Sequence, residues 1–295
     1  MAFFSVTIKA KKSLFGRTPK INLVKILENC KLRFGSYNDF YILEEGEMYD
    51  DMMTLYNPEK IGRGICLDFK EIGNGELTLA CIVPATPTEI DDFFNIIREL
   101  KFQCKNIEIY FEDEKRDEDK FFGLTNTILK VSLDYLKKDC SKDSKFVQKL
   151  ARFPYTFSDE QRNLFKNATD LKEYEDLLHK VQNRDCYYAK PTLRKFPGND
   201  EILACYVFTS NCESIFPIKG DIFLNRDEFE ISDSYINFFL REETRLIEGI
   251  YKYDDFIQYV LNKEPEYFDE DHIIIKMYKD EMLEMVESLQ KIDLM

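Results

Sequence analysis

Apolar and polar residues alternate along two short segments, 65–69 and 77–83, and the turn-forming run Gly73-Asn74-Gly75 lies between them. Alternation with a period of two predicts strands, and the glycines predict a β-hairpin. A two-residue turn would mix the two faces, whereas a three-residue loop gives one uniformly apolar face. The second choice also places Cys66 and Cys81 on opposite faces, where they cannot form a disulfide. The predicted cross-strand pairs are Ile65 with Val83, Leu67 with Cys81, and Phe69 with Leu79.

The segment after this hairpin carries the signals of a helix start. Thr86 is a capping residue, Pro87 suits the first helical position, and Glu89 completes a capping box. Alternation returns at 107–111, so the order is strand, strand, helix, strand, with a right-handed crossover expected. The apolar stripe of the helix consists of Ile90, Phe93, Phe94, Ile97 and Leu100.

The rest of the first 182 residues is predicted to hold one strand and several helices. Residues 3–9 alternate and predict a half-buried strand. A helix should follow, with Thr18 as its cap and Pro19 at its first position. Between 117 and 182 the apolar spacing is helical, and a capping box at Ser158 predicts one further short helix.

A near-repeat links the two halves of the chain. Residues 79–83 (LACIV) recur as 203–207 (LACYV), and each copy precedes a helix-start box, at 86–89 and at 210–213. This pattern favours two related strand-then-helix units, although Pro217 interrupts the second helix. The alternative is a chance match between two apolar strands.

The C-terminal elements complete the fold prediction. Strands are expected at 186–189, 201–208, 221–224 and 272–277, and helices at 236–240, 254–261 and from Lys279. Met and Leu on the last helix are typical of core packing, with a Met-lined groove as the alternative.

These elements predict an α+β fold. Its sheet should be mixed or antiparallel and built from β-hairpin–helix units, with a helical middle segment and, on one interpretation, an internal duplication. The predicted parts are an N-terminal α+β unit at 1–115, a helical segment at 116–183 and a C-terminal α+β unit at 184–295. One compact domain over the whole chain is the alternative.

The charge of the chain and its cysteines argue against a nucleic-acid-binding protein and against a disulfide-bonded secreted one. The 41 Lys and Arg residues against 55 Asp and Glu give a net charge of −14, which disfavours nucleic-acid binding. The eight cysteines form no Cys-x-x-Cys pair and fit reduced thiols. No stretch is apolar enough for a signal peptide or a membrane span, so a cytoplasmic protein is expected.

One basic segment stands out in this acidic chain. Residues 1–27 contain no acid, and Lys9, Lys11, Lys12 and Arg17 are candidates for binding an anion. The other interpretation of these residues is a solvated sheet edge.

Metal chemistry has one candidate segment. Asp269, Asp271 and His272 could hold a divalent cation, and a solvated acidic loop before a strand is the alternative. The other histidine, His179, follows an acidic pair on a predicted helix and fits a surface position. No nucleotide-binding, hydrolase or calcium-loop motif occurs, so no cofactor is predicted.

The run from Tyr56 to Ile65 (YNPEKIGRGI), followed by the hairpin and by residues 84–90 (PATPTEI), resembles a bacterial family known only as a domain of unknown function. The resemblance extends over nearly the whole chain. It implies a bacterial cytoplasmic protein, and it assigns no functional residues.

Two functions remain as hypotheses beside the binding of an anionic ligand by the basic N-terminal segment. The first is a non-enzymatic binding or regulatory protein whose acidic surface binds a basic partner protein. The second is a metal-dependent hydrolase whose carboxylates converge from distant segments, with the Asp269 to His272 run as a donor. The oligomeric state is not predicted.

Overall fold

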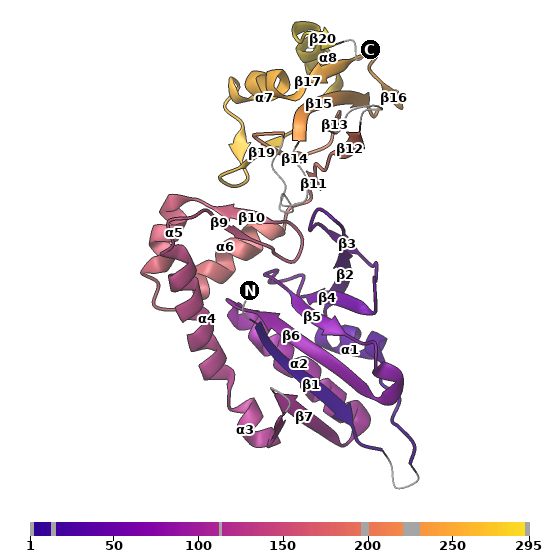
Figure 1. The fold of residues 1–295 in the computed structure, drawn as a ribbon, viewed down its shortest axis with the longest axis vertical. Coiled ribbons are helices and arrows are strands. Elements are labelled where there is room, and N and C mark those ends of the chain that lie inside the picture. Colours follow the sequence, from indigo (N-terminus) through magenta and orange to yellow (C-terminus); the bar gives the residue numbers. More distant parts are fainter. Residues whose placement is uncertain (1–2, 13–15, 112–113, 196–200, 221–230, 293–295) are drawn as a thin grey trace. The chain divides into compact units, whose positions relative to one another are not determined.

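The computed structural model describes most of the chain as two compact units, Met1–Asn183 and Arg184–Met295 (Figure 1). The fold is α+β with antiparallel and mixed sheets, as predicted. The described residues are 3–12, 16–111, 114–195, 201–220 and 231–292.

The N-terminal unit is built on an eight-stranded sheet in which all pairs of neighbouring strands are antiparallel within the described residues. Strand β1 (Phe3–Ala10) lies between β6 (Glu76–Ile82) and β7 (Ile107–Phe111) and is antiparallel to both, so β6 and β7 run parallel to each other. In spatial order the strands are β3 (Leu43–Glu45), β2 (Arg33–Tyr37), β4 (Met52–Tyr56), β5 (Ile65–Asp68), β6 (Glu76–Ile82), β1 (Phe3–Ala10), β7 (Ile107–Phe111) and β8 (Glu114–Arg116).

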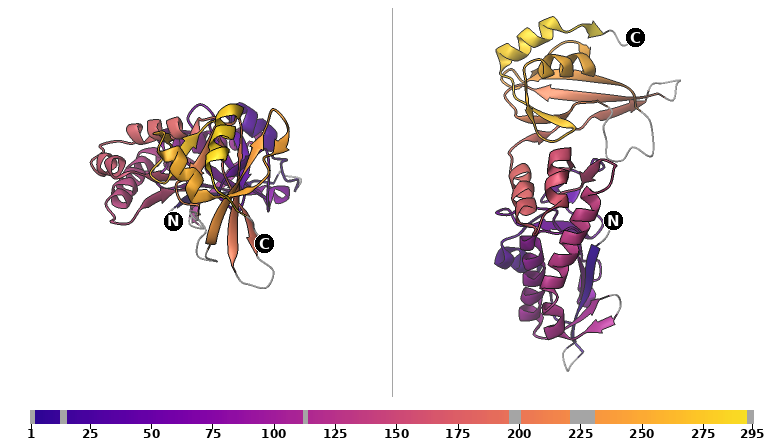
Figure 2. Two further views of the ribbon diagram at one scale, coloured as in Figure 1. Left: turned by 90° about the horizontal axis from the view of Figure 1, so that it is seen from above. Right: turned by 90° about the vertical axis from the view of Figure 1, so that its left-hand side faces the viewer.

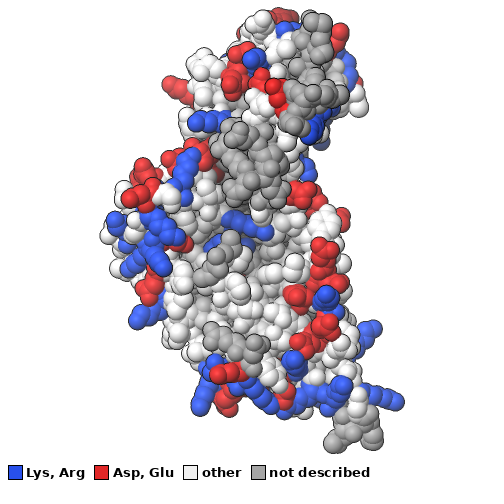
Figure 3. Space-filling view, in the orientation of Figure 1, with Lys and Arg blue, Asp and Glu red and all other residues white. Residues whose placement is uncertain are grey.

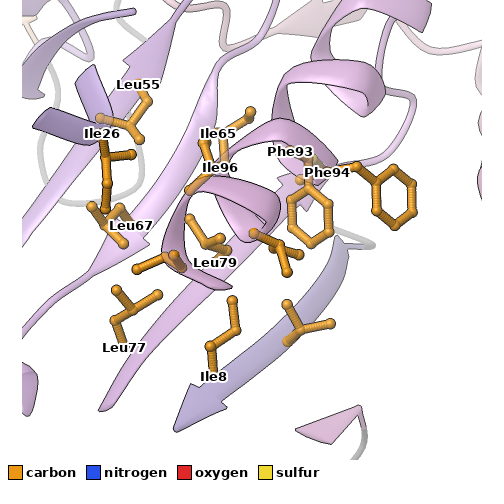
Figure 4. Close-up of a cluster of buried hydrophobic side chains, with 14 of the residues drawn as sticks. Ile8, Ile26, Leu55, Ile65, Leu67, Leu77, Leu79, Phe93, Phe94 and Ile96 are labelled. Atoms are coloured by element: carbon orange, nitrogen blue, oxygen red, sulfur yellow. The ribbon is translucent and has the colours of Figure 1, made fainter. Parts of the chain in front are cut away.

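Two helices, α1 (Leu23–Cys30) and α2 (Pro87–Cys104), lie on one side of this sheet (Figure 2). The core between them is continuous because alternate residues of each strand point toward the helices. Figure 4 shows this cluster, to which the strands contribute Ile8, Leu55, Ile65, Leu67, Leu77 and Leu79 and the helices contribute Ile26, Phe93, Phe94 and Ile96.

The predicted hairpin exists, but its loop is longer than expected. Leu67 pairs with Leu79 rather than with Cys81, and a short 3-10 helix, η1 (Ile72–Asn74), occupies the connection. The error in register is two residues, so the faces are preserved. Cys66 and Cys81 do lie on opposite faces, and all eight cysteines are free.

Two of the predicted helix starts are confirmed, and each has a complete capping box. Thr86 and Glu89 form the reciprocal hydrogen bonds of a capping box at the start of α2, and Ser158 forms one with Gln161 at α5. The cap expected at Thr18 is wrong. Asn22 caps α1 instead, because its side-chain oxygen accepts the backbone N–H of Lys25 at 3.2 Å.

The middle of the chain is not wholly helical, contrary to the prediction. A two-stranded antiparallel sheet, β9 (Phe146–Gln148) with β10 (Tyr155–Phe157), interrupts the helices. The segment is too short for a two-residue period to show clearly in the sequence. The helices are α3 (Glu118–Phe122), α4 (Thr125–Cys140), α5 (Asp159–Lys166) and α6 (Lys172–Gln182).

In its described residues, the C-terminal unit contains two small sheets and two helices around one core. The first sheet has the order β11 (Tyr187–Tyr188), β14 (Ser214–Pro217), β19 (His272–Ile275) and β18 (Glu266–Tyr267). The second has the order β12 (Thr192–Lys195), β13 (Ile202–Thr209), β15 (Ile231–Leu240), β17 (Ile250–Lys252) and β20 (Lys291–Ile292), with β16 (Arg245–Leu246) also on β15. The helices are α7 (Tyr253–Leu261) and α8 (Lys279–Ser288).

Two helix predictions fail in this unit. The box at 210–213 is followed by strand β14 instead of a helix, so the similarity to the N-terminal unit ends with the strand. The helix expected at 236–240 is part of β15, where Ile236, Phe238 and Leu240 alternate into the core. The strand expected at 221–224 lies outside the described residues.

The Met and Leu stripe of α8 packs into the core as predicted. Met282, Met285 and Val286 are buried in the cluster that contains the strands of both sheets. Across the described residues, no helix is long and apolar enough to cross a membrane.

Candidate functional site

The residues predicted to bind metal lie at the turn between β18 and β19. The Nδ1 atom of His272 is 2.8 Å from a carboxylate oxygen of Asp269, and the same oxygen accepts the backbone N–H of Asp271 at 2.8 Å. Both Asp269 and His272 are buried. The turn therefore orients the imidazole through hydrogen bonds that the chain itself supplies.

The second ring nitrogen of His272 also has a protein partner. Its Nε2 atom is 2.7 Å from the hydroxyl oxygen of Tyr188, which comes from β11. A cation would have to displace one of these two contacts. Among the described residues, no group of three or more His, Cys, Asp or Glu side chains is arranged to hold a metal ion.

Replacing Tyr188 with Phe tests the structural importance of this chain of contacts. The change leaves a buried imidazole nitrogen unpaired, so we expect the free energy of unfolding to fall by about 1–3 kcal/mol. Urea denaturation followed by circular dichroism measures it. The neighbouring Tyr187 is 48% exposed, and Tyr187→Phe should change stability by less than about 0.5 kcal/mol. Equal effects of the two substitutions would contradict this role of Tyr188.

The basic residues of the N-terminal segment are at least partly neutralised by acids. The ammonium of Lys9 is 2.8 Å from Glu76, and that of Lys11 is 3.7 Å from Glu108. Lys12 and Arg17 are exposed, on either side of residues 13–15, which lie outside the described part. Two of the four candidate cations therefore already face carboxylates on neighbouring strands, as expected for a charged sheet surface.

The Gly62-Arg63-Gly64 run, which is only superficially similar to part of a phosphate loop, has a structural role. Arg63 is buried and donates to the carbonyl oxygens of Val83 at 3.0 Å and Lys149 at 3.4 Å. The backbone N–H of Gly64 donates to the Glu89 carboxylate. Burial raises the pKa of Glu89, while its backbone hydrogen bonds and Arg63 act in the opposite direction. Through these hydrogen bonds, the segment just before β5 is held against the start of α2.

The face of the sheet opposite α1 and α2 includes a row of small, uncharged side chains, of which Thr54 is buried and the others are half-buried. This cross-strand row runs through Ser5, Ala80, Cys66 and Thr54, each directly opposite the next. Figure 3 shows few charged residues over β1 and β6, and a line of acidic residues on the side where β2, β3 and β4 lie. This line forms an acidic rim on the unit's visible face.

Part of this rim is a tight turn between residues 44 and 52. Met52 donates its backbone N–H to the carbonyl of Tyr49 at 3.0 Å, and the two residues form an antiparallel bridge. Asp50 and Asp51 both have positive φ, 53° and 56°. Two successive left-handed residues define a type I′ hairpin turn, which fixes the direction of its side chains.

The turn exposes apolar side chains among acids. Met48, Tyr49 and Met52 are 54%, 43% and 48% exposed. Glu47, Asp50 and Asp51 are exposed too, and none of the three has an ion-pair partner among the described residues. We call these six residues the acidic turn surface.

The sequence indicated the acids of this surface but not its geometry. Its acidic run was visible as a cluster from Glu44 to Asp51. Interleaving of Met48, Tyr49 and Met52 with acids was the available signal that apolar side chains would be exposed there. The sequence pattern could not reveal that Tyr49 and Met52 flank a two-residue turn, because the turn residues are Asp50 and Asp51 and Asp-Asp is not a strong turn pair.

Comparison with known proteins identifies a family and no relative of known function. No curated protein and no solved structure matches the chain. A family model described as a domain of unknown function matches residues 4–285, which is nearly the whole chain. The resemblance noted from the sequence to a family of unknown function is thus confirmed. The chain belongs to the family Domain of unknown function (DUF4299).

Proposed function

We propose that this protein is a non-enzymatic binding module, and that its acidic turn surface binds a basic amphipathic segment of a partner protein. The observation that carries the proposal is the combination of exposed apolar side chains with unpaired acids on one rigid turn. The cytoplasmic location expected from the sequence is part of the proposal.

The two kinds of side chain have different roles in such a contact. Met48, Tyr49 and Met52 offer apolar area whose burial favours association, and methionine adapts to partners of different shape. Glu47, Asp50 and Asp51 can pair with Lys or Arg without first breaking an internal ion pair. The net charge of −14 should accelerate encounter with a basic partner.

The backbone of the turn lowers the cost of binding. A type I′ turn with a cross-strand bridge holds Tyr49 and Met52 opposite each other before a partner arrives. Less conformational freedom is then lost on association than for a flexible acidic loop.

A defined probe tests the proposal on the full chain. The probe is an amphipathic peptide of Lys and Leu, roughly 14 residues long, with a Glu and Leu peptide of the same pattern as its control. Fluorescence anisotropy measures the dissociation constant. We expect saturable binding of the basic peptide, weakened by added salt, and no binding of the acidic one.

One double variant removes charge without disturbing the turn. Asn-Gly is the preferred pair for a type I′ turn, so Asp50→Asn with Asp51→Gly should keep the hairpin while removing two acids. Binding should weaken about tenfold, since each exposed ion pair contributes up to about 1 kcal/mol. Met48→Ser with Met52→Ser should weaken binding by a similar factor through lost apolar contact.

The matched control removes two exposed acids elsewhere in the same unit. Asp143→Asn with Glu173→Gln changes the net charge equally and should leave the dissociation constant within about twofold. If this control weakens binding as much as the turn variants do, the contact is a general effect of charge and the proposed surface is wrong. Failure of the basic peptide to bind would also overturn it.

A further inference from the structure

A second feature of the N-terminal unit is a half-buried lysine held between aromatic rings. The Nζ atom of Lys149 is 3.5 Å from the centre of the Tyr37 ring and 4.8 Å from that of Tyr41. Tyr37 is itself fixed, because its hydroxyl donates to the carbonyl of Leu150 at 2.9 Å. The ammonium group therefore has a defined position, set by cation–π contacts.

No acid faces this ammonium group. Lys149 makes no hydrogen bond or ion pair through its side chain within the described part of the structure, although acids outnumber basic residues in the chain. Besides Tyr37 and Tyr41, the charged or titratable groups that interact with it are Arg63, from the loop before β5, and Cys66, from β5 itself. Arg63 is buried and repels the ammonium group further.

This environment disfavours the charged form of the lysine. Burial lowers the pKa of Lys149 to about 8. Cys66 acts in the opposite direction, and the Arg63 charge adds a smaller lowering effect. A cation that has lost water contacts and has no counter-ion is in an unfavourable state, and an added anion would relieve it.

We propose that Lys149, positioned by Tyr37 and Tyr41, binds the carboxylate or phosphate group of a small anionic ligand. A carboxylate or phosphate oxygen can accept charge-assisted hydrogen bonds from an ammonium group. The neighbouring row of Ser5, Ala80, Cys66 and Thr54 contains no charged side chain that would compete. The site is separate from the docking function proposed above and does not depend on it.

The affinity for the anion should depend on pH through the protonation of Lys149. The anion binds the protonated lysine, and the protonated fraction falls above the pKa of about 8. Burial raises the pKa values of Cys66 and Tyr37 above their usual values, so neither group becomes more acidic in this site. Affinity should therefore fall about tenfold between pH 6.5 and pH 9.

Nuclear magnetic resonance of the full chain, labelled with carbon-13 at lysine side chains, tests the site. Acetate and inorganic phosphate are titrated separately, which distinguishes a carboxylate site from a phosphate site. We expect the Cε resonance of Lys149 to shift with saturation for at least one of the two anions and its pKa to rise in the complex. Lys115, which pairs with Glu108, is the internal control and should respond weakly and linearly.

A variant separates specific binding from background. Lys149→Met keeps the apolar stem against the Tyr37 ring and removes the charge, so saturable shifts of the surrounding backbone amides should disappear. Lys115→Met should leave those shifts unchanged. The proposal fails if Lys149 responds no more than Lys115 in the unmodified protein, or if saturable shifts persist after Lys149→Met.

Discussion

Replacing Gly64 with alanine should lower the free energy of unfolding of the N-terminal unit by about 2–4 kcal/mol. Gly64 has φ of +85°, and a Cβ atom there would overlap Thr54 Cγ2 and lie 3.1 Å from the Leu55 carbonyl oxygen. The backbone clash cannot be relieved by rotating a side chain. For a unit of this size the melting temperature should fall by roughly 4–15 °C, measured by differential scanning calorimetry.

The matched control for this change is Gly73→Ala. Gly73 lies in η1, its φ is not in the left-handed region, and no atom lies within 4 Å of the position of a Cβ atom. Alanine there should be neutral or slightly stabilising, because it restricts only the unfolded chain. Similar melting temperatures for the two alanine variants would show that the approach of Gly64 to β4 does not constrain the fold.

The second large effect should be an increase in stability. Asp92 on α2 is buried, and burial raises the pKa of its carboxyl group to about 6. Its hydrogen bond from the Asn57 amide, at 3.1 Å, only partly offsets this. Asp92→Asn keeps an acceptor for Asn57 and removes the buried charge, so stability at pH 7 should rise by about 1–3 kcal/mol.

The pH dependence of the unmodified protein has a definite sign at Asp92. Between the unfolded pKa of about 3.9 and the folded pKa of about 6, the folded state binds more protons than the unfolded state. The contribution of Asp92 to stability therefore falls as pH rises through this window. The advantage of Asp92→Asn should appear over the same window and be absent at pH 3.

Urea denaturation at several pH values measures this difference. The exposed neighbour Asp91 is the control, and Asp91→Asn should change stability by less than about 0.5 kcal/mol at any pH. A loss of stability in Asp92→Asn at pH 7 would mean that the carboxylate makes a net favourable contribution in the folded protein.

Local signals in the sequence predicted some elements well and others poorly. The capping box at Thr86 and Glu89 specified the start of α2 because both partners lie within one helical turn. The box at 210–213 has Ser210 and Glu213 at the two positions that form a capping box. The following residues nevertheless form strand β14, so its pairing with β19 takes precedence over that local preference. The 236–240 segment illustrates the same point, because a short apolar run cannot distinguish a helix from a strand.

The candidate sites depended on contacts that a local pattern cannot contain. Asp269 and His272 are three residues apart, and their grouping was visible in the sequence. Tyr188, which satisfies the other ring nitrogen, comes from β11 and was not predicted. Lys149 was missed for the same reason, since Tyr37 and Tyr41 are more than a hundred residues away in the chain.

The measurement that tests the central claim most directly is the location of the peptide-binding surface. Backbone amide shifts of the full chain, labelled with nitrogen-15, should be recorded during titration with the Lys and Leu peptide. The proposed function predicts that the largest saturable shifts cluster at residues 44–52, with smaller ones on the neighbouring strands β2 and β4. Shifts centred on another surface, or dispersed evenly over the exposed acids, would contradict it.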